Sequence, residues 1–153
     1  MAVSRVAYPA RFTVEADGSV AVGFRDLPEA LTSGDNLDEA LAEEASDCLD
    51  VALSYRITRS QDVPPPSPTR RGERLIAPPA QTAAKLALYV SQRAAGLSNV
   101  ALAKRLGCDE KAVRRLLDPR HASRLDRLAD AIHATGGRLE LHLRTPTPER
   151  KSA

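Results

Sequence analysis

SNVALAKRLGCDEKAVRRLL, residues 98–117, decides the fold of the second half of this 153-residue chain. Ala103 stands four residues before Gly107, and Val113 stands six residues after it. Two short helices that cross closely need a small residue at the crossing, a glycine in the turn and a branched apolar side chain that anchors the second helix. The spacing therefore predicts two short helices joined by a glycine turn.

A capping side chain stands before each of these helices. Ser98 precedes a helix over 99–106, and Asp109 precedes a helix that continues to about Asp118. In both places a side-chain oxygen can accept a hydrogen bond from an amide of the first turn. Asp109 and Glu110 leave two roles open, since an acid here either caps the helix or accepts from a cytosine amine of bound DNA.

The second of these helices has an apolar face and a basic face. Val113 and Leu116 point inward at helical spacing, which leaves Lys111, Arg114 and Arg115 on the opposite side. Arginine grips guanine with two hydrogen bonds, and a recognition helix presents such side chains to base edges in the major groove. We therefore predict DNA binding; the alternative is a solvated face of a helical bundle. The residues that we expect to contact DNA are Ser98, Asn99, Lys104, Lys111, Arg114 and Arg115.

Charge divides the chain into an acidic and a basic half. Residues 1–63 contain 5 basic and 12 acidic residues, a net charge of −7, whereas residues 82–144 contain 12 basic and 6 acidic residues, a net charge of +6. The whole chain carries only +2. Such asymmetry suggests two domains with different partners: a polyanion such as nucleic acid for the basic half, and a basic protein, or only water, for the acidic half.

Prolines mark the junction between the halves. VPPPSPTRRG, residues 63–72, contains four prolines, which lack amide donors and fix φ, so this segment is an extended connection. APPA follows as a second break, and ERLIA between the two can form a short strand. We expect a domain over 1–77 with a proline-rich exit, a second domain over 78–144 and a tail over 145–153.

The acidic half begins with a predicted hairpin. YPARFTVEADGSVAVGF, residues 8–24, alternates apolar and polar side chains on both sides of Asp17-Gly18, a pair favoured in two-residue hairpin turns. The following LPEALTSGDN forms a loop with room for a third strand. Acids near this hairpin could be proposed as a metal or catalytic cluster, but the turn explains Asp17 without one.

A long amphipathic helix over about 37–56 completes the acidic half. Asp35 or Asn36 can cap it, and Leu37 and Leu41 begin an apolar stripe at three- and four-residue spacing that packs on the sheet. The acids of this helix lie mostly outside the stripe, as a solvated face or a docking surface for a basic partner. The order of elements predicts a small α+β layer.

Two further helices and a strand surround the glycine turn in the basic half. Amphipathic patterns predict helices over 82–96 and 123–137, both ended by glycine. RLELHLR, residues 138–144, alternates leucine with polar side chains and therefore predicts a strand. This strand has no evident partner in its own chain. Pairing with its copy in a second protomer would satisfy its backbone and give a homodimer or a higher oligomer.

Several classes of protein are not expected. The chain has no apolar run of about 18 residues, and its first residues lack the apolar core of a signal peptide, so we expect a cytoplasmic protein without a membrane span. Cys48 and Cys108 suit small buried hydrophobic positions better than a disulfide. The histidines show no zinc spacing with them. We expect no metal, no cofactor and no enzymatic activity.

The two halves together resemble the HicB family of type II antitoxins, in the branch that ends in a helix-turn-helix. In the acidic half the family motifs are a glycine-containing hairpin turn, DLP, T-x-G-D and EAL, with a proline-serine exit. The basic half looks like a Cro/repressor-type helix-turn-helix domain. The residues that match the motifs are Asp17-Gly18, Asp26-Leu27-Pro28, Thr32 to Asp35, Glu39-Ala40-Leu41 and the PPPSP stretch. The chain departs from the family pattern at Ala30 and Leu31.

The resemblance implies a fold and two partners. The fold is α+β: a small incomplete RNase H-like N-terminal domain without nuclease activity, followed by an all-α helix-turn-helix domain with a C-terminal strand. The first domain would cover a HicA-like toxin, a small basic ribonuclease that cleaves mRNA, through residues that the sequence does not identify. The second would bind the operator of its own operon.

Two other functions remain open. The chain could be a one-component transcription regulator whose N-terminal domain binds a small ligand. A nuclease fused to a DNA-binding domain would require a carboxylate cluster that the sequence does not assemble.

Overall fold

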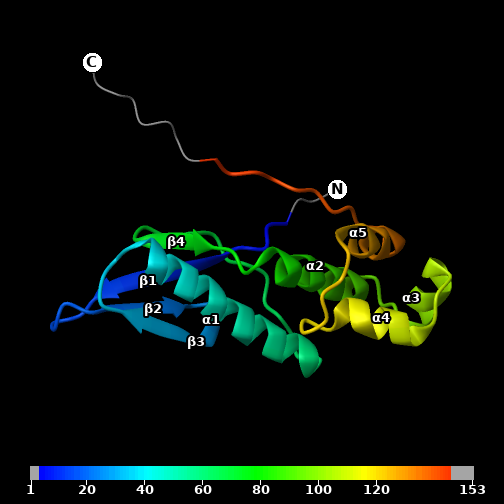
Figure 1. Cartoon of the computed structure of the whole chain (residues 1–153), viewed down its shortest axis with the longest axis horizontal. Helices are drawn as coiled ribbons and strands as arrows, with labels where there is room; N and C mark the ends of the chain where they lie inside the picture. The colour runs from blue at the N-terminus through cyan, green and yellow to red at the C-terminus, as the bar shows by residue number, and fades with distance from the viewer. Residues whose placement is uncertain (1–3, 146–153) are drawn as a thin grey trace, which may run out of the picture.

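The computed structural model describes residues 4–145 and has α+β architecture, as expected. A sheet and one long helix form one end of the molecule, and shorter helices form the other (Figure 1). The elements of the first part are β1 (Tyr8–Val14), β2 (Val20–Phe24), β3 (Leu27–Gly34), α1 (Glu39–Thr58) and β4 (Glu73–Ile76). Those of the second part are α2 (Ala80–Ala94), α3 (Asn99–Leu106), α4 (Glu110–Leu117) and α5 (Leu125–Ala134).

The four described strands form one antiparallel sheet in the order β3-β2-β1-β4. The predicted hairpin is β1–β2, but its last pair is Val14 with Val20, so the loop is longer than two residues. Asp17 lies in this loop and accepts hydrogen bonds from the backbone and hydroxyl of Ser19, while Gly18 has a φ of 88°. The third strand is real and eight residues long.

Helix α1 covers one face of the sheet and builds the first hydrophobic core. Tyr8, Val22 and Phe24 of the sheet pack with Leu49 and Leu53 of the helix, and all five are buried. The helix begins two residues later than predicted because Asp38, and not Asp35 or Asn36, is its N-cap: its carboxylate accepts from the amide of Leu41 at 3.0 Å.

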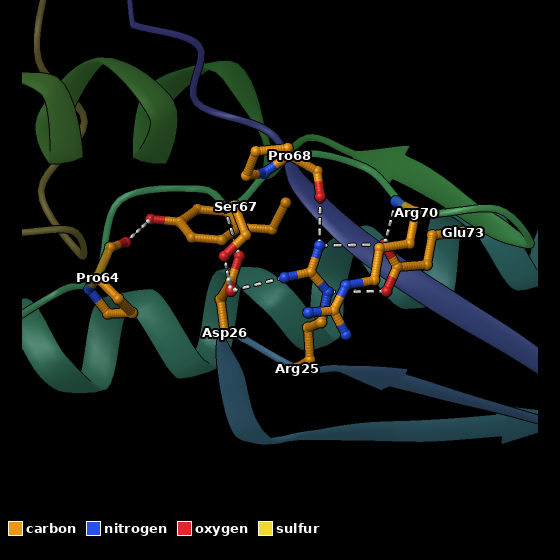
Figure 2. A network of polar contacts seen from close by, with 8 residues as sticks. Arg25, Asp26, Pro64, Ser67, Pro68, Arg70 and Glu73 are labelled. Atoms are coloured by element: carbon orange, nitrogen blue, oxygen red, sulfur yellow. Dashed lines mark hydrogen bonds and ion pairs between the residues drawn. The ribbon is translucent and has the colours of Figure 1, made fainter.

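The proline-rich connection is extended, as predicted, and it is held against the sheet (Figure 2). The amide and hydroxyl of Ser67 donate to Asp26, and the hydroxyl of Tyr8 donates to the carbonyl of Pro64. Burial, together with the nearby charge of Asp26, raises the pKa of Tyr8 to about 12. Arg25 donates to Glu73 at 2.8 Å, at the start of β4. These hydrogen bonds attach the connection to the β2–β3 turn and to β1, and they attach that turn to the start of β4.

Helix α2 contributes to two cores. Leu86 and Tyr89 pack into the first core with the sheet and α1. Ala84 and Leu88 pack into a second core, which α3, α4 and α5 complete. The hydroxyl of Tyr89 also donates to the carbonyl of Gln61 at 2.7 Å. The basic half is therefore joined to the acidic half by shared packing as well as by the chain.

The predicted C-terminal strand over 138–144 does not form in the described chain. Leu139 lies half-buried against the second core, but Leu141 and Leu143 are 74% and 88% exposed. The leucine alternation is present, yet none of the four described strands pairs with this segment. Of the expected tail over 145–153, all but the first residue lies outside the described residues.

Candidate nucleic-acid interface

The turn between α3 and α4 has the geometry that the glycine spacing predicted. Gly107 adopts φ 65° and ψ 34°, in the left-handed region that favours glycine. A Cβ placed there would meet no atom within 4 Å, so backbone conformation, not crowding, is what calls for glycine. The amide of Cys108 closes the turn by donating to the carbonyl of Ala103 at 3.1 Å.

Both helices begin at the predicted caps. The Ser98 hydroxyl accepts from the amide of Ala101 at 3.0 Å, and the Asp109 carboxylate accepts from the amide of Ala112 at 2.7 Å. The role of Asp109 that the sequence left open includes, at least, helix capping. Because each cap satisfies a free amide, the two short helices have fixed starting points.

The crossing of the two helices is packed by the residues that the spacing singled out. Ala103 and Leu102 of α3 are buried, as are Val113 and Leu116 of α4. All four belong to the second core, where Leu128 of α5 lies behind them. The apolar side of α4 therefore packs into the second core, and the opposite side of the helix faces solvent.

The outward face of α4 is basic. Lys111, Arg114 and Arg115 are exposed, as is Lys104 on α3. Arg114 donates to Glu110 at 2.7 Å, one helical turn earlier, so part of its charge is neutralised. Lys104, Lys111 and Arg115 form no salt bridge with any residue that the structure describes. These three cations are therefore available to an external anion.

Ser98 and Asn99 lie beside a groove rather than on the basic face itself. The groove has a volume of about 510 Å³ and lies between the end of α1, α2 and the α3–α4 pair. Arg93, Arg114 and Asp118 also line it. The Asn99 side chain is engaged within the protein, because its Oδ1 accepts from the side-chain Nε2 of Gln92 at 2.8 Å.

Two basic residues of this region donate hydrogen bonds to backbone carbonyls at the ends of helices. Arg105 donates to the carbonyl of Ala134 at 2.9 Å, at the end of α5. Lys85 of α2 is completely buried and donates to the carbonyl oxygens of Arg115 and Leu116. Lys85 was not identified from the sequence, although this lysine stands where the helical spacing of α2 calls for an apolar residue.

The acidic half presents a charged face on α1. Glu43, Glu44 and Asp47 are exposed and form no salt bridge with the described residues, and α1 carries no basic residue before Arg56. Elsewhere Arg56 pairs with Glu29 and holds the pKa of that carboxyl below its usual range. The face of α1 is therefore a surface of uncompensated negative charge.

The described residues contain no group of three or more histidine, cysteine or acidic side chains that could hold a metal ion. Cys48 and Cys108 are free thiols and half-buried. Among the helices of residues 4–145, none is long and apolar enough to cross a bilayer.

The chain is similar to known antitoxins over most of its length. The sequence profile described as "HicB_like antitoxin of bacterial toxin-antitoxin system" matches residues 7–87. The chain is 37% identical over 134 residues to Antitoxin HicB 2 of Photorhabdus laumondii, covering 88% of this chain and 94% of that protein. It is 32% identical to Antitoxin HicB of Escherichia coli K12, covering 88% and 96%. It is 33% identical to Antitoxin HicB of Pseudomonas fluorescens, covering 83% and 87%.

These similarities extend beyond the sheet and α1. The profile match ends at residue 87, within α2, whereas the alignments to the three antitoxins cover more than four fifths of the chain. Antitoxins of this family are not known as enzymes, which agrees with the expectation from the sequence. The chain belongs to the HicB-like antitoxin family of bacterial toxin–antitoxin systems.

Proposed function

We propose that this chain neutralises a HicA-like, mRNA-cleaving toxin in the cytoplasm and represses its own operon by binding operator DNA. In this proposal the sheet and α1 are an incomplete RNase H-like domain that covers the toxin. Helices α2–α5 are a Cro/repressor-type helix-turn-helix domain, in which α4 is the recognition helix. Relatives named Antitoxin HicB that align with both halves support a role for both.

The observation that carries the DNA-binding part is the two-sided character of α4. Val113 and Leu116 hold the helix from behind, while Lys111 and Arg115 project from the other side without a salt bridge to a described residue. A helix so fixed can enter the major groove with its cations already oriented. Arg114 joins them when a base or a phosphate replaces Glu110 as its partner.

Three further residues suit contacts to the DNA backbone. Ser98 and Asn99 stand at the N-terminus of α3, where free amides and the helix dipole favour an anion. Lys104 projects from the same helix. Contacts of this kind position a protein on the duplex without reading its sequence.

Electrostatics favours the proposed toxin as partner of the first domain. Residues 1–63 carry a net charge of −7, and the exposed acids Glu43, Glu44 and Asp47 of α1 lack neutralising partners among the described residues. The family resemblance implies a basic ribonuclease. Opposite potentials speed encounter and disfavour wrong partners.

A homodimer would match the symmetry of an operator. Two recognition helices are needed to read two half-sites about 34 Å apart. The exposed leucines Leu141 and Leu143 give a second copy an apolar, extended segment with which to pair. We therefore propose that residues 138–144 form a strand in the dimer that they cannot form alone.

Co-expression tests the proposal. The open reading frame adjacent to this gene is induced in cells that carry the parent protein or a Lys111→Ala/Arg115→Ala variant, and a reporter follows the promoter upstream of both. We expect both antitoxins to rescue growth and only the parent to repress the reporter. Failure of the parent to rescue growth contradicts the toxin assignment, and equal repression by both contradicts the assignment of α4.

A further inference from the structure

A charged side chain is buried at the centre of the second half of the molecule. Lys85 lies on α2 with an exposed fraction of 0%, between Ala84 and Leu88, which both belong to the second core. An ammonium group in such surroundings is strongly unfavourable unless its donors are used. The hydrogen-bond acceptors of this ammonium group therefore indicate its structural role.

All three donors of the ammonium have acceptors. Nζ donates to the carbonyl oxygen of Arg115 at 3.1 Å, to that of Leu116 at 2.9 Å and to the hydroxyl of Ser123 at 2.8 Å. The hydroxyl of Ser123 in turn donates to the carbonyl of His121. Because a neutral amine has only two N–H donors, this geometry fits the charged form.

The two carbonyls belong to the last turn of α4. Carbonyls at the end of a helix have no partner within the helix, and the helix dipole makes this end negative. Lys85 supplies both the missing donors and a positive charge. Burial lowers the pKa of Lys85, while the charge of Asp118, the C-cap of α4, acts in the opposite direction.

A second contact of α2 holds the chain that follows α4. Gln81, one turn before Lys85 on the same helix, donates to the carbonyl of Ser123 at 2.7 Å and accepts from its amide at 3.1 Å. Gln81 and Lys85 together form what we call the α2 clamp. It fixes both the end of α4 and the loop that leads to α5.

We propose that Lys85 is a positioning residue for DNA recognition, which sets the orientation of α4 by binding its C-terminal carbonyls. This inference rests on the proposed DNA-binding function. The carbonyl of Arg115 accepts from Lys85, and the side chain of the same residue is exposed to solvent. A shift of this carbonyl therefore also shifts the Arg115 side chain. Base readout needs side chains in a fixed orientation, whereas attraction to phosphates tolerates movement. Loss of the α2 clamp therefore reduces discrimination between operator and other DNA more than it reduces binding to DNA in general.

The test compares Lys85→Met with Leu88→Ala. Met keeps the length of the side chain and removes the ammonium, whereas L88A opens a cavity in the same core and leaves the contacts to α4 carbonyls in place. Affinities for operator and scrambled DNA are measured by fluorescence anisotropy at a temperature where circular dichroism shows all three proteins folded. For K85M we expect operator binding to weaken about tenfold, or about 1.4 kcal/mol, with scrambled DNA bound as by the parent. L88A should keep the parent's ratio of the two affinities.

A parent-like ratio for K85M overturns the positioning role. If K85M does not fold, Gln81→Ala replaces it, because this variant removes the other half of the α2 clamp. Q81A should lower the ratio of operator affinity to scrambled-DNA affinity by less than K85M would. An unchanged ratio again contradicts the proposal. A parent protein that does not discriminate operator from scrambled DNA contradicts the proposed function instead. Amide hydrogen exchange tests, without DNA, whether Lys85 stabilises the end of α4. K85M should speed exchange selectively at residues 114–118. Exchange at the parent's rate there overturns the positioning role of Lys85.

Discussion

At the scale of single residues, a few polar side chains determine how the connection between the two halves is held. Arg25 pairs with Glu73 at 2.8 Å, and the Glu73 side chain is only 3% exposed. Asp26 accepts twice from Ser67. These contacts bring the turn after β2 against the strand that follows the prolines (Figure 2). The DLP motif therefore has a structural role in holding the proline-serine exit.

The first prediction concerns acid stability. Hydrogen bonds from Arg25 and from the Arg70 amide lower the pKa of Glu73 from 4.5 to about 2. Since the unfolded chain takes up this proton first, the stabilisation is complete above about pH 4.5 and is lost as the pH falls towards 2. Glu73→Gln should therefore be less stable than the parent in urea at about pH 7, and the difference should shrink below about pH 4.5.

Glu15→Gln is the matched control, because Glu15 is exposed in the hairpin loop and forms no salt bridge with a described residue. It should unfold like the parent at every pH. If the free energy of unfolding of Glu73→Gln lies below that of the parent by the same amount at neutral and acid pH, the Arg25–Glu73 ion pair does not stabilise the fold.

The second prediction concerns the glycine turn. Gly107 has a φ of 65° and open space around it, so alanine would meet strain without a clash. Gly107→Ala should lower the free energy of unfolding by about 1–2 kcal/mol, the cost of a left-handed backbone for a residue with a Cβ. Gly107→Asn should lose less, because asparagine tolerates this region better. Equal stability of parent and Gly107→Ala in denaturant titrations would contradict the observed turn.

The sequence predicts the position of a residue correctly where several physical constraints coincide. At the α3–α4 turn the caps, the glycine and the buried Val113 each followed from a separate rule, and all agree with the structure. The start of an apolar stripe was predicted wrongly: Leu37, expected to begin the stripe that packs on the sheet, is 55% exposed, whereas Leu41 is buried. A stripe shows only which side of a helix is apolar, and the neighbouring elements decide how far the burial extends.

At the scale of elements, the segment after α5 differs most from what its sequence predicts. RLELHLR alternates as a strand does, yet the described chain leaves it extended and unpaired, with Leu141 and Leu143 exposed. Alternation shows only that a segment can pair; a strand also needs a partner edge. A second protomer would provide that edge.

The third prediction follows for this segment. Deletion of residues 138–153 should weaken self-association and operator binding together, because two joined recognition helices gain affinity that separate ones lack. Leu141→Lys should act in the same direction without shortening the chain. Sedimentation and operator titration measure the two effects. A truncated protein with unchanged mass in solution and unchanged affinity would exclude this segment from the dimer.

At the scale of the whole molecule, α2 connects the two hydrophobic cores. Leu86 and Tyr89 complete the core of the sheet and α1, while Leu88 and Lys85 support the other helices. The charge split and the prolines predicted two parts with a boundary near Pro78. They could not predict that the first helix after the boundary packs on both, because shared packing leaves no mark in composition.

The fourth prediction concerns the minimal toxin-binding part. A chain ending after α2, at Gly96, should neutralise the toxin, whereas one ending near Pro78 should be less stable. The shorter chain lacks Leu86 and Tyr89, whose burial contributes about 1.5–3 kcal/mol each. Thermal unfolding and growth rescue compare the two. Equal stability of both chains would show that α2 does not belong to the first core.

The most direct test of DNA recognition by α4 is a titration of single alanine variants of Lys111, Arg114 and Arg115 on operator and scrambled DNA at several salt concentrations. Arg11→Ala, which removes one exposed charge from β1, is the control. Loss of a base-reading side chain should cost about 1–3 kcal/mol on operator DNA alone. Loss of a phosphate contact should weaken both DNAs alike and flatten the salt dependence by about one unit. All variants should still neutralise the toxin. If all three fold and bind operator DNA as the parent does, α4 is only a solvated helix and not the recognition helix.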